Sequence, residues 1–169
     1  MSAVLLLDSN IWSHLVLSDA AKRAAVQQQL AALHAKYPGA ALATSALCVA
    51  ECLVAARRLP DVADRALAEA AFQRFFDDPS VIVVDVSPPL LDRAATLRAD
   101  ALRLAALARG QPAGPDGGKL RLPDAVVAAS CLAFAPPAVL VTENTRDFTL
   151  LDAQGQPHTV AGLVVERVG

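Results

Sequence analysis

The sequence predicts an α/β fold of three layers, α/β/α, around a central parallel sheet of four to five strands. Short apolar runs alternate with longer segments of helical pattern along most of the chain. Strands that alternate with helices form parallel sheets covered by helices on both faces. The 169 residues fit one domain, 1–169, and no internal repeat or linker divides them.

The elements of the first part of the chain follow from apolar runs, capping residues and breakers. In order, we expect a buried strand Val4–Leu7, a short helix from the capping residues Ser9 and Asn10 to Leu17, a helix Ala20–Lys36 capped by Asp19, a weak strand Ala40–Ala43, and a helix Ala46–Arg58 capped by Thr44 or Ser45. Pro60 stops the last of these helices.

The second part continues the alternation. We expect a helix Val62–Phe76 capped by Asp61, a β-branched strand Val81–Val86, a long helix from Ser87 and Pro88 to about Arg109, a flexible loop Gln111–Gly118, a helix from Pro123 and Asp124 to near Phe134, a strand Ala138–Val141 and a last strand Leu163–Val165. In such sheets, ligands bind beyond the carboxyl ends of the strands.

The composition is apolar, with 54% hydrophobic residues and a mean hydropathy of +0.40. No apolar run reaches the roughly 18 residues of a membrane span. The run Ala3–Leu7 is short for a signal peptide and no basic residue precedes it. We therefore expect a cytoplasmic protein with no membrane association and with an apolar surface for partners.

The net charge and the cysteines bear on two kinds of site, a basic nucleic-acid surface and a zinc site. The net charge of −2 excludes a broad basic field for nucleic acid, so bound metal ions would have to supply positive charge. The three cysteines, Cys48, Cys52 and Cys131, lie in apolar runs without a CxxC pair or a nearby histidine. They are therefore interpreted as core residues rather than zinc ligands.

Isolated acidic residues are the most informative feature. Asp8 is the only formally charged residue before Asp19, Glu51 lies alone in an apolar helix, and Asp124 opens another. A lone buried carboxylate costs several kcal/mol unless it is paired, protonated or bound to metal. A fourth acid, Asp147, follows the strand Ala138–Val141. Together these acids suggest a shared ion.

Each acid has a purely structural alternative. Asp8 could end its strand in an Asx turn, Asp124 could complement a helix dipole, and Asp147 could pair with Arg146. Glu51 has no basic residue three or four positions away on its helix, although a salt bridge from elsewhere in the chain would also satisfy it. Oxygen ligands without histidine favour Mg²⁺ or Mn²⁺, and with no other nucleophile they point to phosphodiester hydrolysis.

Four sequence blocks resemble PIN-domain nucleases, in particular the VapC toxins of bacterial toxin–antitoxin pairs. The blocks are VLLLDSN (Val4–Asn10), TSALCVAECL (Thr44–Leu53), LPDAVVAAS (Leu122–Ser130) and VTENTRDF (Val141–Phe148). They occur in the family's order, and each contains an acid of the implied site. The resemblance therefore covers nearly the whole chain.

The resemblance implies a site, a substrate and partners. Its metal and catalytic residues would be Asp8, Glu51, Asp124 and Asp147, with Asn10, Thr44, Thr142 and Asn144 contacting substrate or supporting the acids. It also implies Mg²⁺ or Mn²⁺ as cofactor, RNA as substrate, a homodimer, and a small antitoxin as inhibitor. Many relatives have an aspartate where Asn144 stands, and this chain places its acid three residues later. We assign metal binding to Asp147 and an orienting role to Asn144.

The functional expectation is a Mg²⁺-dependent endoribonuclease, the toxin of a type II toxin–antitoxin system. The alternatives are an RNA-maturation nuclease of the same fold without antitoxin, and a catalytically silent α/β binding module. The presence of all four acids favours an enzyme.

Overall fold

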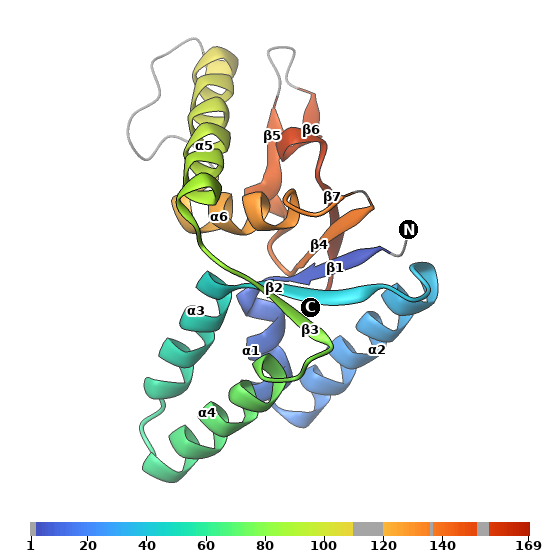
Figure 1. The fold of residues 1–169 in the computed structure, drawn as a ribbon, viewed down its shortest axis with the longest axis vertical. Helices are drawn as coiled ribbons and strands as arrows, with labels where there is room; N and C mark the ends of the chain where they lie inside the picture. Colours follow the sequence, from blue (N-terminus) through green and yellow to red (C-terminus); the bar gives the residue numbers. More distant parts are fainter. Residues whose placement is uncertain (1–2, 110–119, 136, 152–155) are drawn as a thin grey trace.

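The computed structural model describes residues 3–109, 120–135, 137–151 and 156–169 (Figure 1). Its elements are β1 (Val4–Leu7), α1 (Ser9–Leu17), α2 (Ala20–Lys36), β2 (Ala41–Ser45), α3 (Ala46–Arg57), α4 (Val62–Phe76), β3 (Val81–Val84), α5 (Pro88–Arg109), α6 (Leu122–Cys131), β4 (Ala138–Thr142), the 3₁₀ turn η1 (Thr145–Phe148), β5 (Thr149–Leu151), β6 (Pro157–Thr159), the 3₁₀ turn η2 (Val160–Gly162) and β7 (Val164–Arg167).

Five strands form one parallel sheet in the order β3-β2-β1-β4-β7, which confirms the predicted α/β architecture. The first strand lies at the centre of the sheet, where Val4 pairs in register with Ala41 on one side and Ala138 on the other. Consequently β1, β2 and β4 all end at the same edge. The residues that follow them, from distant parts of the sequence, are brought together there.

Two apolar cores cover the two faces of the sheet, because successive side chains of a strand point to opposite faces. Leu5 and Leu7 of β1 pack with residues of α1 to α4, whereas Leu6 packs with residues of α5 and α6. Figure 1 shows the same division, with α1 to α4 on one side of the sheet and α5, α6 and the β5–β6 hairpin on the other. None of the described helices combines the length and hydropathy needed to cross a bilayer.

The structure corrects several predicted boundaries. The strand Val81–Val86 ends at Val84, because the chain turns there and the Ser87 N–H donates to the Asp85 carbonyl. The helix expected to reach Phe134 ends at Cys131, after which the Ala133 and Phe134 N–H groups bond to carbonyls three residues back. The remaining differences are small: β2 and β7 are shifted to Ala41–Ser45 and Val164–Arg167, and α3 ends at Arg57.

Two further features differ from prediction. Residues 149–159 contain a short antiparallel hairpin, β5–β6, that was not predicted, so not every strand belongs to the parallel sheet. The helix α1 is capped by Asp8, whose side chain accepts from the Ser9 N–H, rather than by Ser9 or Asn10. The predicted loop Gln111–Gly118 lies outside the described residues.

Candidate metal centre

The candidate site lies at the edge of the sheet where β1, β2 and β4 end and where α1 and α3 begin. Asp8 follows β1 directly, Ser45 caps α3, and Thr142 is the last residue of β4. The helix α6, which carries Asp124, contacts α3, β2, β4 and η1. The carboxyl edge of a parallel sheet is the usual ligand site of such folds.

Asp8 is the most highly connected acid of the site. Its Oδ1 accepts from the Ser9 N–H at 2.7 Å, and its Oδ2 accepts from the Thr142 hydroxyl at 2.7 Å and from the Asn10 side-chain amide at 2.9 Å. All of these donors are neutral. Burial therefore raises the pKa of the Asp8 carboxyl above its ordinary value, although the bonds from Thr142, Ser9 and Asn10 oppose the rise.

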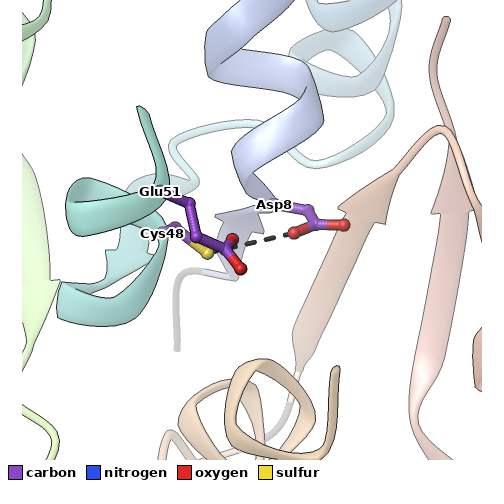
Figure 2. A group of neighbouring side chains, drawn as sticks. All are labelled: Asp8, Cys48 and Glu51. Atoms are coloured by element: carbon purple, nitrogen blue, oxygen red, sulfur yellow. Dashed lines mark hydrogen bonds between the residues drawn. The ribbon is translucent and has the colours of Figure 1, made fainter. Parts of the chain in front are cut away.

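Glu51 and Cys48 project from α3 toward Asp8, as Figure 2 shows. Asp8, Cys48 and Glu51 each offer a ligand atom, and these atoms lie within 4.8 Å of one another. The Cys48 thiol donates to Asp8 Oδ1 at 3.9 Å, the contact drawn as a dashed line. Among the described residues, Glu51 has no hydrogen-bond or ion-pair partner, so the salt bridge considered from sequence is absent there.

Asp124 stands half-buried in the first turn of α6. Its Oδ2 accepts from the Arg121 backbone N–H at 3.2 Å. Burial, together with the negative charges of Asp147 and Asp8, raises the pKa of Asp124 to about 6, against the opposing effect of Arg121. Asp147 and Asp8 are thus close enough to act on the pKa of Asp124, although Asp124 and Asp147 lie outside the 4.8 Å group.

Asp147 lies in the short 3₁₀ turn η1. The turn begins after β4, and the Asp147 N–H donates to the Asn144 carbonyl at 3.4 Å. The Asn144 side-chain amide donates to Asp147 Oδ2. Asn144 thus contacts a neighbouring carboxylate, and the orienting role assigned to it stays a prediction.

The supporting polar residues occupy different places. Asn10 and Thr142 contact Asp8 directly, and Thr142 also accepts from the Asn144 N–H at 3.1 Å. Thr44 is fully buried, and its hydroxyl donates to the Leu7 carbonyl at 3.1 Å, so it braces the end of β1 rather than touching an acid.

Ion pairing does not account for the four carboxylates, although the charge of Arg121 acts on the pKa of Asp124. None of them forms an ion pair within the described parts of the chain. Clustered carboxylates repel one another and bind divalent cations through hard oxygen atoms. The donor set, four carboxylates with amide and hydroxyl groups around them, therefore fits Mg²⁺ or Mn²⁺ better than zinc.

Two features of the site were not predicted from sequence. Cys48 was interpreted as a core residue, and it is fully buried, but its thiol also contacts the acidic group. Its spacing from Glu51 on one helix could have indicated this, since residues three apart share a face. The second feature is a network in which the Glu143 carboxylate accepts from His14 and Lys22. No spacing rule connects residues so distant in sequence.

The raised pKa of Asp124 predicts a pH-dependent stability of the metal-free protein. A carboxyl group whose pKa is raised by folding stabilises the fold fully below its ordinary value of 3.8, and this contribution is lost as pH rises through about 6. Wild type should therefore lose stability relative to Asp124→Asn between pH 4 and 7. We expect a difference of about 1 kcal/mol, since solvent screens a half-exposed group.

Urea unfolding of both proteins in EDTA at several pH values measures this difference. Parallel pH profiles for wild type and Asp124→Asn would contradict the assignment of the raised pKa to Asp124.

Comparisons with known proteins agree with this architecture. Residues 5–152 match the family model of the PIN domain. No curated protein matches the chain by sequence. Three solved structures share its fold at low sequence identity.

The first structure is VapBC2 from Rickettsia felis bound to a promoter DNA fragment, with a TM-score of 0.61, 17% identity, and coverage of 98% of this chain and 99% of that one. The second is VapBC-1 from nontypeable Haemophilus influenzae, with a TM-score of 0.59, 19% identity, and coverage of 97% of each chain. The third is VapC20 from Mycobacterium tuberculosis, described as a toxin that cleaves the sarcin–ricin loop, with a TM-score of 0.52, 17% identity, and coverage of 76% and 82%.

Proposed function

This chain belongs to the PIN domain family, and on that premise we propose that residues 1–169 form a single metal-dependent endoribonuclease domain, the toxin of a toxin–antitoxin pair. One observation carries the proposal: four carboxylates gather around one edge of the sheet, and none forms an ion pair among the described residues. The similar VapBC and VapC structures support the toxin assignment.

Asp8, Glu51, Asp124 and Asp147 would hold Mg²⁺ or Mn²⁺. When bound, the cation would supply positive charge to a phosphodiester and lower the pKa of water. The protein's own part is to orient the acids: Thr142 and Asn10 fix Oδ2 of Asp8, and Asn144 fixes Asp147. The amino ends of α1, α3 and α6 also point their positive dipole ends toward this edge, which favours a bound phosphate.

The proposed function is tested by incubating RNA with the purified protein in Mg²⁺, in Mn²⁺ and in EDTA. Cleavage is expected in either metal and should stop in EDTA. Full cleavage in EDTA would contradict the metal mechanism. RNA binding without cleavage in either metal would instead support a silent binding module.

The neighbouring gene separates a toxin from an RNA-maturation nuclease. A toxin of this kind should be encoded beside a small DNA-binding protein that inhibits it, and co-expression with that neighbour should abolish cleavage. Cleavage that persists in the presence of the neighbouring protein would favour an RNA-maturation nuclease. The absence of such a neighbouring gene would favour it as well. Mapping RNA 5′ ends after induction in cells would then identify the substrate.

Exposed apolar residues on α3 and α4 form the proposed partner surface, whereas α2 exposes alanines rather than large apolar residues. Val62 and Leu67 are 71% and 69% exposed, and Val54 is 51% exposed. A hollow of about 310 Å³ adjoins them between α1 and α4, lined by Val16, Leu17, Leu59, Asp64, Leu67, Ala68 and Ala71. Phe75 is partly exposed beside the ring of Trp12.

We expect this surface to pack against the antitoxin and, in part, against a second copy of the chain. Light scattering of the protein purified alone should therefore report a dimer. A monodisperse monomer that stays in solution at high concentration without a partner would count against this expectation.

A further inference from the structure

Glu143, the residue that follows β4, is held by two helices at once. Its Oε2 accepts from His14 Nε2 of α1 at 2.8 Å, and its Oε1 accepts from Lys22 Nζ of α2 at 3.1 Å. The other ring nitrogen of His14 bonds to the Ser18 hydroxyl at 3.0 Å, which fixes the ring. Hydrogen bonds from His14 and then Lys22 lower the pKa of Glu143, so the carboxylate is ionised at neutral pH.

The backbone of the same residue continues the chain of contacts to the acidic site. The Glu143 N–H donates to Asn10 Oδ1 at 3.2 Å. This bond leaves the amide nitrogen of Asn10 free to donate to Asp8 Oδ2 at 2.9 Å and to the Thr142 hydroxyl at 3.1 Å. If the Asn10 amide turned over, its oxygen would face the Asp8 carboxylate and repel it. The Glu143 N–H therefore sets the orientation of Asn10.

Glu143 also begins the segment that carries the fourth acid. Asn144 follows it directly, and its side chain donates to Asp147. The side chain of Glu143 packs against the backbone of Gly169, where an added Cβ would lie 3.0 Å from Glu143 Cγ. Glu143 is thus fixed on several sides, and it lies between the residues that orient Asp8 and Asp147.

We propose that Glu143 is a positioning residue of the acidic site: its tether to His14 and Lys22 keeps Asn10 directed at Asp8 and Asn144 directed at Asp147. Glu143 itself touches neither acid in any contact described above. The role rests on the proposed function, because it matters only if these acids hold a metal. Partly exposed ion pairs contribute little to stability, so the fold should survive loss of the tether.

The test uses two changes with opposite effects on charge. Glu143→Gln removes a negative charge, which by long-range electrostatics alone would weaken the binding of a cation. The double variant His14→Leu with Lys22→Met removes a positive charge, which by the same reasoning would strengthen cation binding. Both changes break the tether. A positioning role therefore predicts weaker binding in both.

Mn²⁺ affinity of the metal-free protein is measured by titration calorimetry, and the melting temperature is measured in parallel. Each tether variant should bind Mn²⁺ about 10-fold more weakly, as is usual for residues that orient metal ligands. Glu166→Gln is the matched control, because Glu166 likewise accepts from a lysine and a neutral group, Lys36 and the Tyr37 hydroxyl, on β7. Glu166→Gln should leave the Mn²⁺ affinity within about twofold of the wild-type value. It should change the melting temperature about as much as the tether variants do.

Unchanged affinity in Glu143→Gln would overturn the positioning role. Stronger binding in the double variant would also overturn it and leave long-range charge as the explanation. If wild type bound no Mn²⁺, the proposed metal function would fail first and the positioning role with it, an outcome that the calorimetry separates from the other two.

Discussion

Replacing Asp8 by Asn or Glu51 by Gln is expected to reduce RNA cleavage by more than about 100-fold, because residues that merely orient metal ligands already change affinity or activity 10- to 100-fold. Asp8 and Glu51 come from β1 and α3, and their ligand atoms lie within 4.8 Å of each other. Loss of either carboxylate leaves the pair unable to hold a cation between them.

The same substitutions should leave the metal-free fold intact. Glu51 has no partner to lose among the described residues, so Glu51→Gln removes only charge repulsion and should hold or raise the melting temperature. Burial raises the pKa of Asp8, which means that folding favours the neutral group at this position. In Asp8→Asn an amide nitrogen replaces an oxygen that accepts two hydrogen bonds, so we expect the variant to lose no more than about 2 kcal/mol of stability.

Cleavage rate and urea unfolding, measured on the same preparations, separate a metal role from a structural one. Asp92→Asn is the control, because Asp92 is an exposed acid on α5, outside the proposed partner surface, and its loss also removes one negative charge. It should cleave as wild type does. A large loss of stability in Asp8→Asn or Glu51→Gln, with cleavage retained, would support the structural alternative.

Asp147→Asn is expected to raise the Mg²⁺ concentration needed for half-maximal cleavage by about 10-fold, whereas Asn144→Ala should mainly lower the maximal rate. Asp147 offers a charged oxygen that Mg²⁺ prefers, and η1 curls it back beside Asn144. Asn144 offers a neutral amide that donates to the Asp147 carboxylate, so its loss disorders the acid without removing it.

Metal titrations of the cleavage rate distinguish these roles. Asn144→Asp is the informative companion, since it adds a carboxylate three residues before Asp147. If Asn144→Asp lowered the Mg²⁺ concentration needed for half-maximal cleavage while Asp147→Asn left it unchanged, the roles of Asn144 and Asp147 would be reversed.

The sheet was predictable because several of its strands are short apolar runs. Val4–Leu7 and Ala138–Val141 are apolar throughout, as expected for strands buried on both faces. The β5–β6 hairpin has strands of three residues, and Pro157 and His158 give β6 no apolar pattern. Local periodicity carries no signal for such an element, so the hairpin was missed.

The acids of the site were predictable from their isolation, whereas their contacts were not. Glu51 stood out because an unpaired acid inside an apolar helix is costly. The bond between His14 and Glu143 joins residues 129 positions apart, and both read as ordinary surface residues in the sequence. Only the pairing of β1 with β4 brings them together. The residue types therefore indicated a metal site. The order of the strands in the sheet brings together the residues that orient its acids.

Because β1 lies at the centre of the sheet, the proposed acidic site can form only late in translation. The strand β1 is synthesised first, but it cannot pair with β4 until the chain is 134 residues longer, since Val4 pairs with Ala138. The final contact of that region, from the Val168 N–H to the Thr142 carbonyl, needs residues made later still. Sheets closed by such distant pairings fold slowly and late. A nascent chain on the ribosome would thus hold Asp8 without its partners from β4, and the proposed acidic site would stay incomplete until Thr142 and Val168 had been made.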